Sequence, residues 1–194
     1  MGKWENGRMN MIEPIILDTS RLVLKGFTPE DMTFIFEQLP KEEIKKLLGH
    51  RSDEEYKKEE GKQKNGYASY NRRFVLFLLI EKESQTIFGR CGLHNWNADH
   101  SRAEIGYSIE IPEFKQKGLM SEAVEAIIAF GFRDLKLNRI EALVGEGNIP
   151  SLKIMSKFNF TKEGVLREHS NIAESKFENS LVFSLLKSEF KINR

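Results

Sequence analysis

The chain has 194 residues, which is enough for one well-buried domain and short for two. Apolar residues make up 40% of it and charged residues 30%, and 30 Lys and Arg oppose 29 Asp and Glu for a net charge of +1. This balance gives no reason to expect nucleic acid as the main partner. A single cysteine, Cys91, excludes an internal disulfide and a cysteine-based zinc site. Because the sequence shows neither a signal-peptide pattern nor an apolar run of membrane-spanning length, we expect a cytoplasmic protein without membrane contact.

The sequence divides into a short polar tail and one domain. Residues 1–14 are mostly polar and end at Pro14, and we expect them to form a poorly ordered tail. No linker, internal repeat or low-complexity tract interrupts residues 15–194, so a single domain is expected there. Within it, residues 21–27 carry the apolar pattern of a first strand.

Helix signals follow this strand. Thr28 can cap a helix whose first turn holds Pro29 and two acids, and that helix should stop near Pro40. A second short helix is expected up to Gly49. Residues 52–71 are dense in charge at helical spacing, which predicts a solvated helix. A mobile flap over an acceptor site is the alternative for this segment.

The rest of the chain alternates between apolar strands and two amphipathic helices. Residues 73–80 form an almost unbroken apolar run, typical of a strand covered on both faces. Further strands are expected at 86–96, 101–111, 139–144, 160–168 and 176–186, and helices at 120–135 and 148–158. The order predicts one mixed α/β domain in which antiparallel hairpins precede a strand–helix–strand crossover.

A basic, glycine-containing turn, Lys115–Ser121, joins an apolar strand to the start of a helix. Such a turn collects unpaired backbone N–H groups around one point, and the helix dipole adds partial positive charge there. The turn therefore predicts a site for a phosphate or pyrophosphate. Taken alone, it would also suit an unrelated nucleotide- or phosphate-binding protein.

Four ordered motifs make the prediction more specific. They are Ala103-Glu104-Ile105-Gly106-Tyr107-Ser108-Ile109, Pro112-Glu113-Phe114, Lys117-Gly118-Leu119-Met120-Ser121-Glu122-Ala123 and Asn148-Ile149-Pro150-Ser151. In this order they resemble the GNAT N-acetyltransferase superfamily, and more narrowly its RimJ/RimL-type ribosomal-protein N-terminal acetyltransferases. The resemblance spans roughly residues 18–187. The turn departs from the superfamily pattern, because Lys115 stands where Gln or Arg is usual and Met120 where Gly or Ala is usual.

The resemblance implies a seven-stranded mixed sheet, flanked by helices, whose parallel fourth and fifth strands splay apart into a V. Acetyl-CoA would lie in this V, and no metal is implied. A main-chain N–H near Ile109 would stabilise the oxyanion of the thioester. The pantetheine would pair with Ile109, Glu110 and Ile111, and the pyrophosphate would sit on the amides of Gln116, Lys117, Gly118, Leu119, Met120 and Ser121.

The second motif supplies two further residues. Asn148 would bond the pantetheine arm, although it is equally well placed to cap the following helix. Ser151 would lie near the sulfur as a possible proton donor to the departing thiolate. Cys91 is not expected to carry the acyl group, because the sequence around it offers no base to activate it.

Two carboxylates are candidates for the general base that removes the proton of the acceptor ammonium. Glu104 is the first choice, and its alternative reading is a surface carboxylate paired with Arg102 or Arg90. Glu168, beside His169, is the second choice. His94 and His100 could contact the acceptor, and Trp96 and Tyr107 could line its pocket, although surface exposure and ordinary packing explain these four as well.

The sequence thus predicts an N-acetyltransferase that transfers an acetyl group directly from acetyl-CoA to a primary amine in a ternary complex. The expected acceptor is a protein N-terminal α-amine, such as that of a ribosomal protein. Acetylation of a small amine (a polyamine or an aminoglycoside) is one alternative, and a non-catalytic acyl-CoA-binding module is another. A monomer and a homodimer are both compatible with the sequence.

Overall fold

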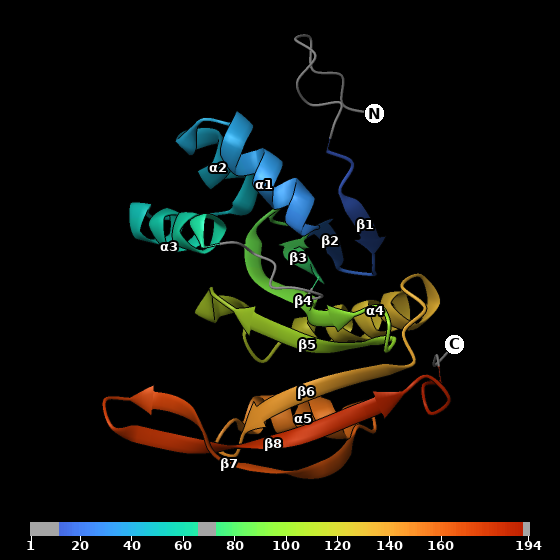
Figure 1. The fold of residues 1–194 in the computed structure, drawn as a ribbon. Coiled ribbons are helices and arrows are strands. Elements are labelled where there is room, and N and C mark those ends of the chain that lie inside the picture. The colour runs from blue at the N-terminus through green and yellow to red at the C-terminus, as the bar shows by residue number, and fades with distance from the viewer. Residues whose placement is uncertain (1–11, 66–72, 192–194) are drawn as a thin grey trace.

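The computed structural model describes residues 12–65 and 73–191, which build one eight-stranded sheet in the order β1-β2-β3-β4-β5-β6-β8-β7 (Figure 1). The strands are β1 (Ile15–Asp18), β2 (Leu22–Phe27), β3 (Arg73–Glu81), β4 (Ile87–Asn97), β5 (Arg102–Ile109), β6 (Arg139–Gly145), β7 (Thr161–Ala173) and β8 (Lys176–Leu186). The helices are α1 (Pro29–Gln38), α2 (Lys41–Leu48), α3 (Asp53–Lys64), α4 (Leu119–Arg133) and α5 (Ile149–Lys157), with a 3-10 turn at Pro112–Phe114.

The expected mixed α/β fold is confirmed, but the expected number of strands was wrong: the sheet has eight strands, not seven. The additional strand is β1, which pairs antiparallel with β2 at the edge of the sheet. With four residues it is too short to show a clear alternating pattern in the sequence. The predicted tail falls mostly in residues 1–11, outside the described residues.

The N-terminal helices begin and end where the sequence signals lie. Thr28 and Asp31 form a reciprocal capping box at the start of α1, and α2 ends at Gly49, whose φ of 72° lies in the left-handed region. The charged segment forms α3, capped by Ser52; its predicted continuation to residue 71 lies partly outside the described residues. No helix of the described residues is long and apolar enough to cross a membrane.

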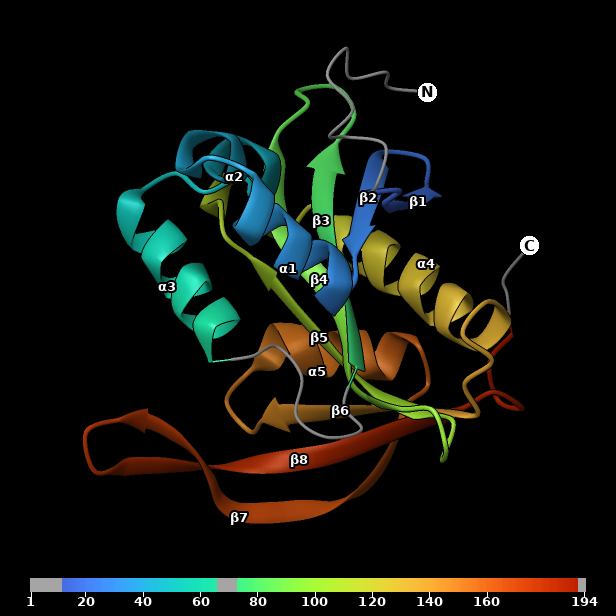
Figure 2. The same cartoon turned by 45° about the horizontal axis from the view of Figure 1, so that its top comes forward.

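The helices cover opposite faces of the sheet, as Figure 2 shows with α1 in front and α4 behind. Strand side chains alternate between the two faces. Phe77 and Leu79 of β3 therefore belong to the main core under α4 and α5, whereas Leu78 belongs to the second core with α1 and α2. A ligand on either side of the sheet thus meets different helices.

The parallel strands β5 and β6 diverge, as the sequence resemblance implied. Their pairing covers Arg102–Arg139, Ala103–Ile140 and Glu104–Glu141 and stops there, although both strands continue beyond it (Figure 1). The V opens after this last pair. Backbone groups of β5 that face β6 beyond this point have no strand to bond, so they are available to a ligand.

Strand β7 is longer than predicted. It runs to Ala173 instead of ending at Glu168, and its pairing with β8 shifts register between Leu166 and Ser170. Glu168 sits within that irregularity at a φ of 49°. The C-terminal half of β7 consists mostly of charged and polar residues, so the apolar pattern in the sequence did not predict it as a strand.

Candidate active site

The turn after β5 is held in a fixed shape by its own backbone and by aromatic packing. The ring of Phe114 stacks on Phe88 of β4 with centroids 4.9 Å apart. Gln116 and Gly118 then adopt left-handed φ values of 60° and 76°. Together these features direct the chain from the end of β5 into the first turn of α4.

The first turn of α4 leaves its amides available. Gly118 is the N-cap residue and has no side chain to bond the first amides of the helix. Met120 is buried in the main core, so its side chain does not obstruct the backbone although it is larger than Gly or Ala. Unpaired amides at a helix N-terminus attract anions.

The carboxylate of Glu122, in the same turn, is paired with residues near the N-terminal end of the domain. The Arg21 side chain donates to Glu122 from Nε at 2.7 Å, and the Arg21 backbone N–H donates to the other carboxylate oxygen at 2.7 Å. Thr19 Oγ donates to the same oxygen, also at 2.7 Å. Burial favours a raised pKa for Glu122, but these hydrogen bonds outweigh it and lower the pKa from its usual value. The Arg21 charge thus offsets the Glu122 charge beside the anion-attracting amides.

A pocket of 950 Å³ opens above this turn between α4 and α5, and we call it the α4–α5 pocket. The open V contributes one wall of it. Of the predicted cofactor residues, those that line the pocket are Ile109, Gln116, Gly118, Leu119, Met120, Ser121, Asn148 and Ser151. Glu110, Ile111 and Lys117 do not line it.

Backbone hydrogen bonds explain why Ile109 lines the pocket whereas Glu110 and Ile111 do not. The amides of Glu110 and Ile111 both donate to the carbonyl of Phe88, at 2.9 and 3.3 Å, so they are occupied within the sheet. Because successive peptide groups of a strand point in opposite directions, the N–H and C=O of Ile109 face the open V. Ile109 is therefore the residue of this group whose backbone can meet a ligand.

Two lysines of the α4–α5 pocket were missed by the sequence reasoning. Lys153 and Lys157 lie one helical turn apart on α5 and both line the pocket, as does Lys115 of the turn. Their spacing after Asn148 was a usable signal, because it places two cations on the same face of a helix whose start was already assigned to the cofactor.

Asn148 and Ser151 occupy the start of α5. The Oδ1 atom of Asn148 accepts from the backbone N–H of Ser151 at 3.2 Å, so the capping role of Asn148 is confirmed and its side-chain N–H groups are left to donate elsewhere. Across the pocket, the buried Tyr107 hydroxyl has no hydrogen-bond partner. Burial raises the pKa of Tyr107, and the nearby Ser151 hydroxyl opposes that rise without reaching hydrogen-bond geometry.

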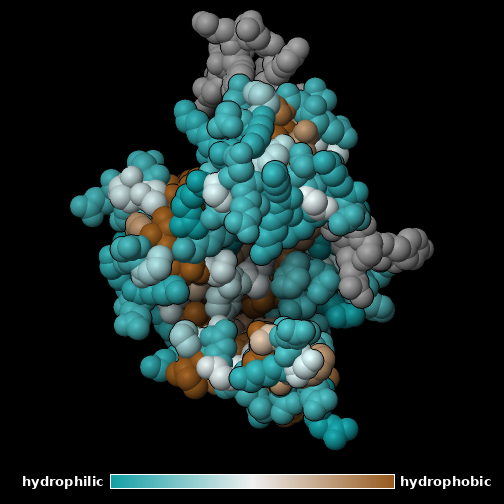
Figure 3. Space-filling model, turned by 90° about the vertical axis from the view of Figure 1, so that its left-hand side faces the viewer, coloured by the Kyte–Doolittle hydropathy of each residue, from teal (hydrophilic) through white to brown (hydrophobic). Residues whose placement is uncertain are grey.

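A second, smaller pocket of 380 Å³ lies on the opposite face of the sheet, beneath α3, and we call it the α3 pocket. Gly92 and Gly106, which pair across β4 and β5, line it without side chains, and α3 contributes Glu59 and Lys62. Tyr107 and Ser108 line both pockets. Figure 3 views the molecule from the side where the V opens and shows hydrophobic atoms recessed between hydrophilic surfaces.

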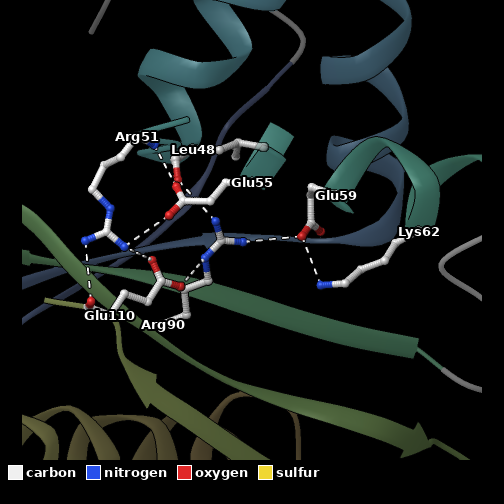
Figure 4. Close-up of polar contacts among 7 residues, drawn as sticks. All are labelled: Leu48, Arg51, Glu55, Glu59, Lys62, Arg90 and Glu110. Atoms are coloured by element: carbon white, nitrogen blue, oxygen red, sulfur yellow. Dashed lines mark hydrogen bonds and ion pairs between the residues drawn. The ribbon is translucent and has the colours of Figure 1, made fainter. Parts of the chain in front are cut away.

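Arg90 of β4 holds α3 in place beside this pocket, as Figure 4 shows. Its guanidinium lies 3.0 Å from Glu110 and 3.6 Å from Glu59, and it donates to the carbonyl of Leu48 at 3.5 Å. Arg51 approaches the other oxygen of Glu110 at 3.6 Å. The predicted cofactor residue Glu110 thus directs its side chain into the network that fixes α3, away from the α4–α5 pocket.

Glu104 is bound by its neighbours on β4. His94 Nε2 lies 3.4 Å from Oε1, and Asn95 donates to Oε2 at 2.9 Å. Burial favours a raised pKa for Glu104, but His94, Asn95 and the nearby His169 outweigh it and lower the pKa from its usual value. The alternative pairing with arginine was wrong: Arg102 pairs with Glu141, and Arg90 pairs as described above.

The other candidates lie apart from both pockets or are chemically inert. Glu168 is exposed on the irregular part of β7, where its backbone N–H donates to Asn179. His100 lies on the exposed β4–β5 turn. Cys91 is fully buried, and burial raises its thiol pKa, so it offers no thiolate. The described residues contain no group of His, Cys, Asp and Glu that could hold a metal ion.

The splayed strands, the turn with unpaired amides and the pocket between them have the arrangement that the sequence resemblance implied. The model of the acetyltransferase (GNAT) domain matches residues 21–161, so the chain belongs to the GNAT acetyltransferase family. The predicted class of enzyme, an acetyl-CoA-dependent N-acyltransferase, is thereby confirmed.

Curated relatives carry the same class in their names. The chain is 41% identical to "Uncharacterized N-acetyltransferase p20" of Bacillus licheniformis over 59% of its own length and 63% of the relative's. It is 33% identical to "Uncharacterized N-acetyltransferase YoaA" of Bacillus subtilis over 79% of its length and 87% of that protein. "Putative ribosomal N-acetyltransferase YdaF" of the same organism is 31% identical over 55% of this chain and 57% of its own.

Solved structures agree on the fold. A structure described as a probable acetyltransferase matches 91% of this chain and 99% of its own with a TM-score of 0.66 at 25% identity. A chimera of the spermidine N-acetyltransferase SpeG from Vibrio cholerae matches 90% of this chain and all of its own with a TM-score of 0.65. At 21% identity, this second likeness shows the fold alone.

Proposed function

We propose that this protein transfers the acetyl group of acetyl-CoA directly to the N-terminal α-amine of a protein, in a ternary complex. The observation that carries the proposal is the meeting of two pockets at Tyr107 and Ser108 of β5. One pocket offers groups that suit a phosphorylated thioester, and the other offers groups that can remove a proton from an amine. A non-catalytic acyl-CoA-binding module would not need the second set.

The α4–α5 pocket supports the acetyl-CoA half of the proposal. Its turn presents free amides to a diphosphate, and Lys153 and Lys157 add cationic groups for further phosphate oxygens. The Ile109 backbone faces the V and would pair with the pantetheine arm or polarise the thioester carbonyl. The unpartnered Tyr107 hydroxyl would receive or donate a hydrogen bond once the ligand is present.

The α3 pocket supports a peptide acceptor over a polycation. Its charged lining residues are Lys62 and Arg90 against Glu59, so it lacks the excess of acid that would attract a polyamine. An α-amine also needs less help from the enzyme, because its pKa is about 7.7–8.0 against about 10.4 for a lysine amine. A base of moderate strength therefore suffices for an N-terminal acceptor.

The relatives leave a second candidate. The name of YdaF refers to a ribosomal acceptor, whereas the SpeG chimera is described as a spermidine N-acetyltransferase. The charge of the α3 pocket favours the first kind, and a ribosomal protein N-terminus is the acceptor we propose. Acetylation of a polyamine is the alternative that the experiment below separates from it.

In the proposed reaction, the acceptor ammonium loses a proton on the side of Glu104, and the free amine attacks the thioester carbonyl. The carbonyl oxygen gains negative charge, which the Ile109 N–H stabilises. The carbon–sulfur bond breaks, and the second proton of the nitrogen passes to the CoA thiolate by way of the Ser151 and Tyr107 hydroxyls. Both residues line the α4–α5 pocket.

The test is an incubation of the protein with acetyl-CoA and a mixed library of N-terminal peptides, polyamines and aminoglycosides, read by mass spectrometry. We expect a single acetyl group on the α-amine of a subset of the peptides. Acetylated spermidine with unmodified peptides would contradict the proposed acceptor while leaving the class of enzyme intact.

A further inference from the structure

Glu104 is poorly placed to accept a proton itself. Each of its carboxylate oxygens already has a partner, His94 Nε2 at 3.4 Å and Asn95 Nδ2 at 2.9 Å. Its pKa is also lowered, and a general base works best when its pKa lies near the working pH. A group that contacts Glu104 and titrates closer to neutrality would therefore be more effective, and histidine is the residue type with that property.

The imidazole of His94 lies over Gly106 of β5, in the α3 pocket. A Cβ atom built on Gly106 would lie 3.0 Å from Cε1 and 3.4 Å from Nδ1 of this ring, but 3.9 Å from Nε2. The Cε1–Nδ1 edge thus faces Gly106, and Nε2 turns back to Glu104. Because Gly106 lies two residues before Ser108, the ring extends from Glu104 along β5 toward Ser108. Its side chain is 45% exposed and lines the α3 pocket, so an acceptor can reach it.

We propose that His94 is the general base that takes the proton from the acceptor ammonium, and that Glu104 is the positioning residue that orients its imidazole. The inference rests on the function proposed above and names a further catalytic residue for it. A proton on Nε2 of the neutral ring would face the Glu104 carboxylate, 3.4 Å away, and would leave the Nδ1 lone pair as the proton acceptor.

The proton balance of the step is simple. The ammonium gives one proton to Nδ1 of His94, which becomes an imidazolium stabilised by the Glu104 carboxylate. The nitrogen forms its bond to the carbonyl carbon as the carbon–sulfur bond breaks, and its second proton passes to the CoA thiolate. The imidazolium then releases its proton to solvent, so the products are the amide, CoA thiol and one proton.

Several charged groups surround this pair. Glu104 approaches from β5 and His169 from β7, where it affects the Glu104 carboxylate. Arg90 lies farther along β4, and α3 contributes Glu59 and Lys62 to the same pocket. Arg90 and Lys62 are each paired with Glu59, so their charges are largely compensated within the pocket wall.

The first test is the pH–rate profile of His94→Gln, with His100→Gln on the exposed turn as the matched control. We expect kcat of His94→Gln to fall by about 100-fold or more at pH 7, with acetyl-CoA affinity unchanged. The loss should shrink above about pH 8, where the α-amine is already deprotonated. His100→Gln should match the wild type. A His94→Gln enzyme with the wild-type profile would overturn the proposal.

A second test needs no acceptor, so it separates this inference from the proposed function. Nitrogen-detected NMR of the imidazoles should find neutral His94 protonated at Nε2, and Glu104→Gln should shift the nitrogen signals of this ring. A neutral form protonated at Nδ1 would overturn the proposal. A wild type that acetylates no peptide would count against the proposed function alone.

Gly106→Ala provides a positioning test that keeps both partners of the pair. The added methyl group would meet the His94 ring at 3.0 Å and push it away from β5. We expect a lower kcat with unchanged acetyl-CoA affinity and an intact fold by circular dichroism. An unaltered kcat in a variant whose imidazole NMR signals have shifted would contradict the assigned position.

Discussion

Glu104 of β5 and Glu141 of β6 are the last residues that pair in the parallel part of the sheet. Two neighbouring carboxylates would repel each other, but each has its own partners: Glu104 binds His94 and Asn95, and Glu141 binds Arg102 and Arg139. The V therefore opens at a point where two like charges are separately compensated. The strands diverge immediately beyond the candidate catalytic groups, so an acyl-CoA bound in the V as proposed would lie next to them.

The shape of the phosphate-attracting turn depends on Gly118. Proline cannot adopt its φ of 76° and has no N–H, so Gly118→Pro should weaken CoA binding on the order of tenfold or more. Isothermal titration calorimetry measures the affinity. The matched control is Gly61→Ala in α3, where an added Cβ meets nothing within 4 Å. It should stabilise the fold by about 1 kcal/mol and leave CoA affinity unchanged.

The α5 lysines should contribute to CoA affinity through charge. We expect Lys153→Gln and Lys157→Gln each to raise the Kd for CoA by about fivefold at low ionic strength, because each removes a cation from the pocket wall. The loss should diminish as salt is added, since screening weakens the same interaction in the wild type. Lys162→Gln, on exposed β7, is the control. Equal effects of all three substitutions would show that the pocket position does not matter.

The Tyr107 hydroxyl should lower the stability of the fold and raise the rate of the reaction. Tyr107→Phe removes a buried group without a hydrogen-bond partner, so the free energy of unfolding should rise by about 1 kcal/mol. The kcat should fall, because the hydroxyl faces the departing thiolate in the proposed reaction. Urea denaturation and steady-state kinetics measure the two effects. Tyr56→Phe, which loses a hydrogen bond of 3.0 Å to Glu60, should not gain stability.

The contacts of Glu163 on β7 with Arg139 on β6 and Ser184 on β8 should make the stability of the fold depend on pH in acid. Arg139 and Ser184 bind Glu163 and lower its pKa from 4.5 to about 2. A carboxylate whose pKa is lowered by folding stabilises the protein above its unfolded-state pKa and loses that contribution as the pH falls. The contribution of Glu163 should therefore disappear between about pH 4.5 and pH 2.

Glu163→Gln tests this pH dependence. The variant should be less stable than the wild type at pH 7, and the difference should vanish by about pH 2 in thermal melts. A difference that is constant over this range would mean that packing, and not ionisation, links Glu163 to its neighbours.

Local signals in the sequence were enough for most helices and strands and for the residues that line the α4–α5 pocket at the starts of α4 and α5. Thr28, Gly49 and Asn148 act where capping rules place them, and the apolar stripe of α4 is long enough to be unambiguous. These features depend on neighbours within a few residues. The short edge strand β1 and the polar half of β7 were missed because their pairing partners, and not their own composition, stabilise them.

The acceptor side depends on contacts between distant residues. Arg90 meets Glu59 and Glu110 only because α3 folds over the sheet, and no local pattern predicts that contact. The pair of His94 and Glu104 was within reach of sequence reasoning, since a hairpin between the predicted strands sets them opposite each other. Without the register, however, His94 looked like an ordinary surface residue near a turn.

Tyr107 and Ser108 separate two pockets that open on opposite faces of the sheet. With acetyl-CoA in one pocket and the acceptor in the other, as proposed, neither substrate would have to pass through the entrance of the other, and a fixed order of addition would not be required. Double-reciprocal plots at several fixed concentrations of each substrate would then intersect, and CoA could depart while the acetylated product is still bound.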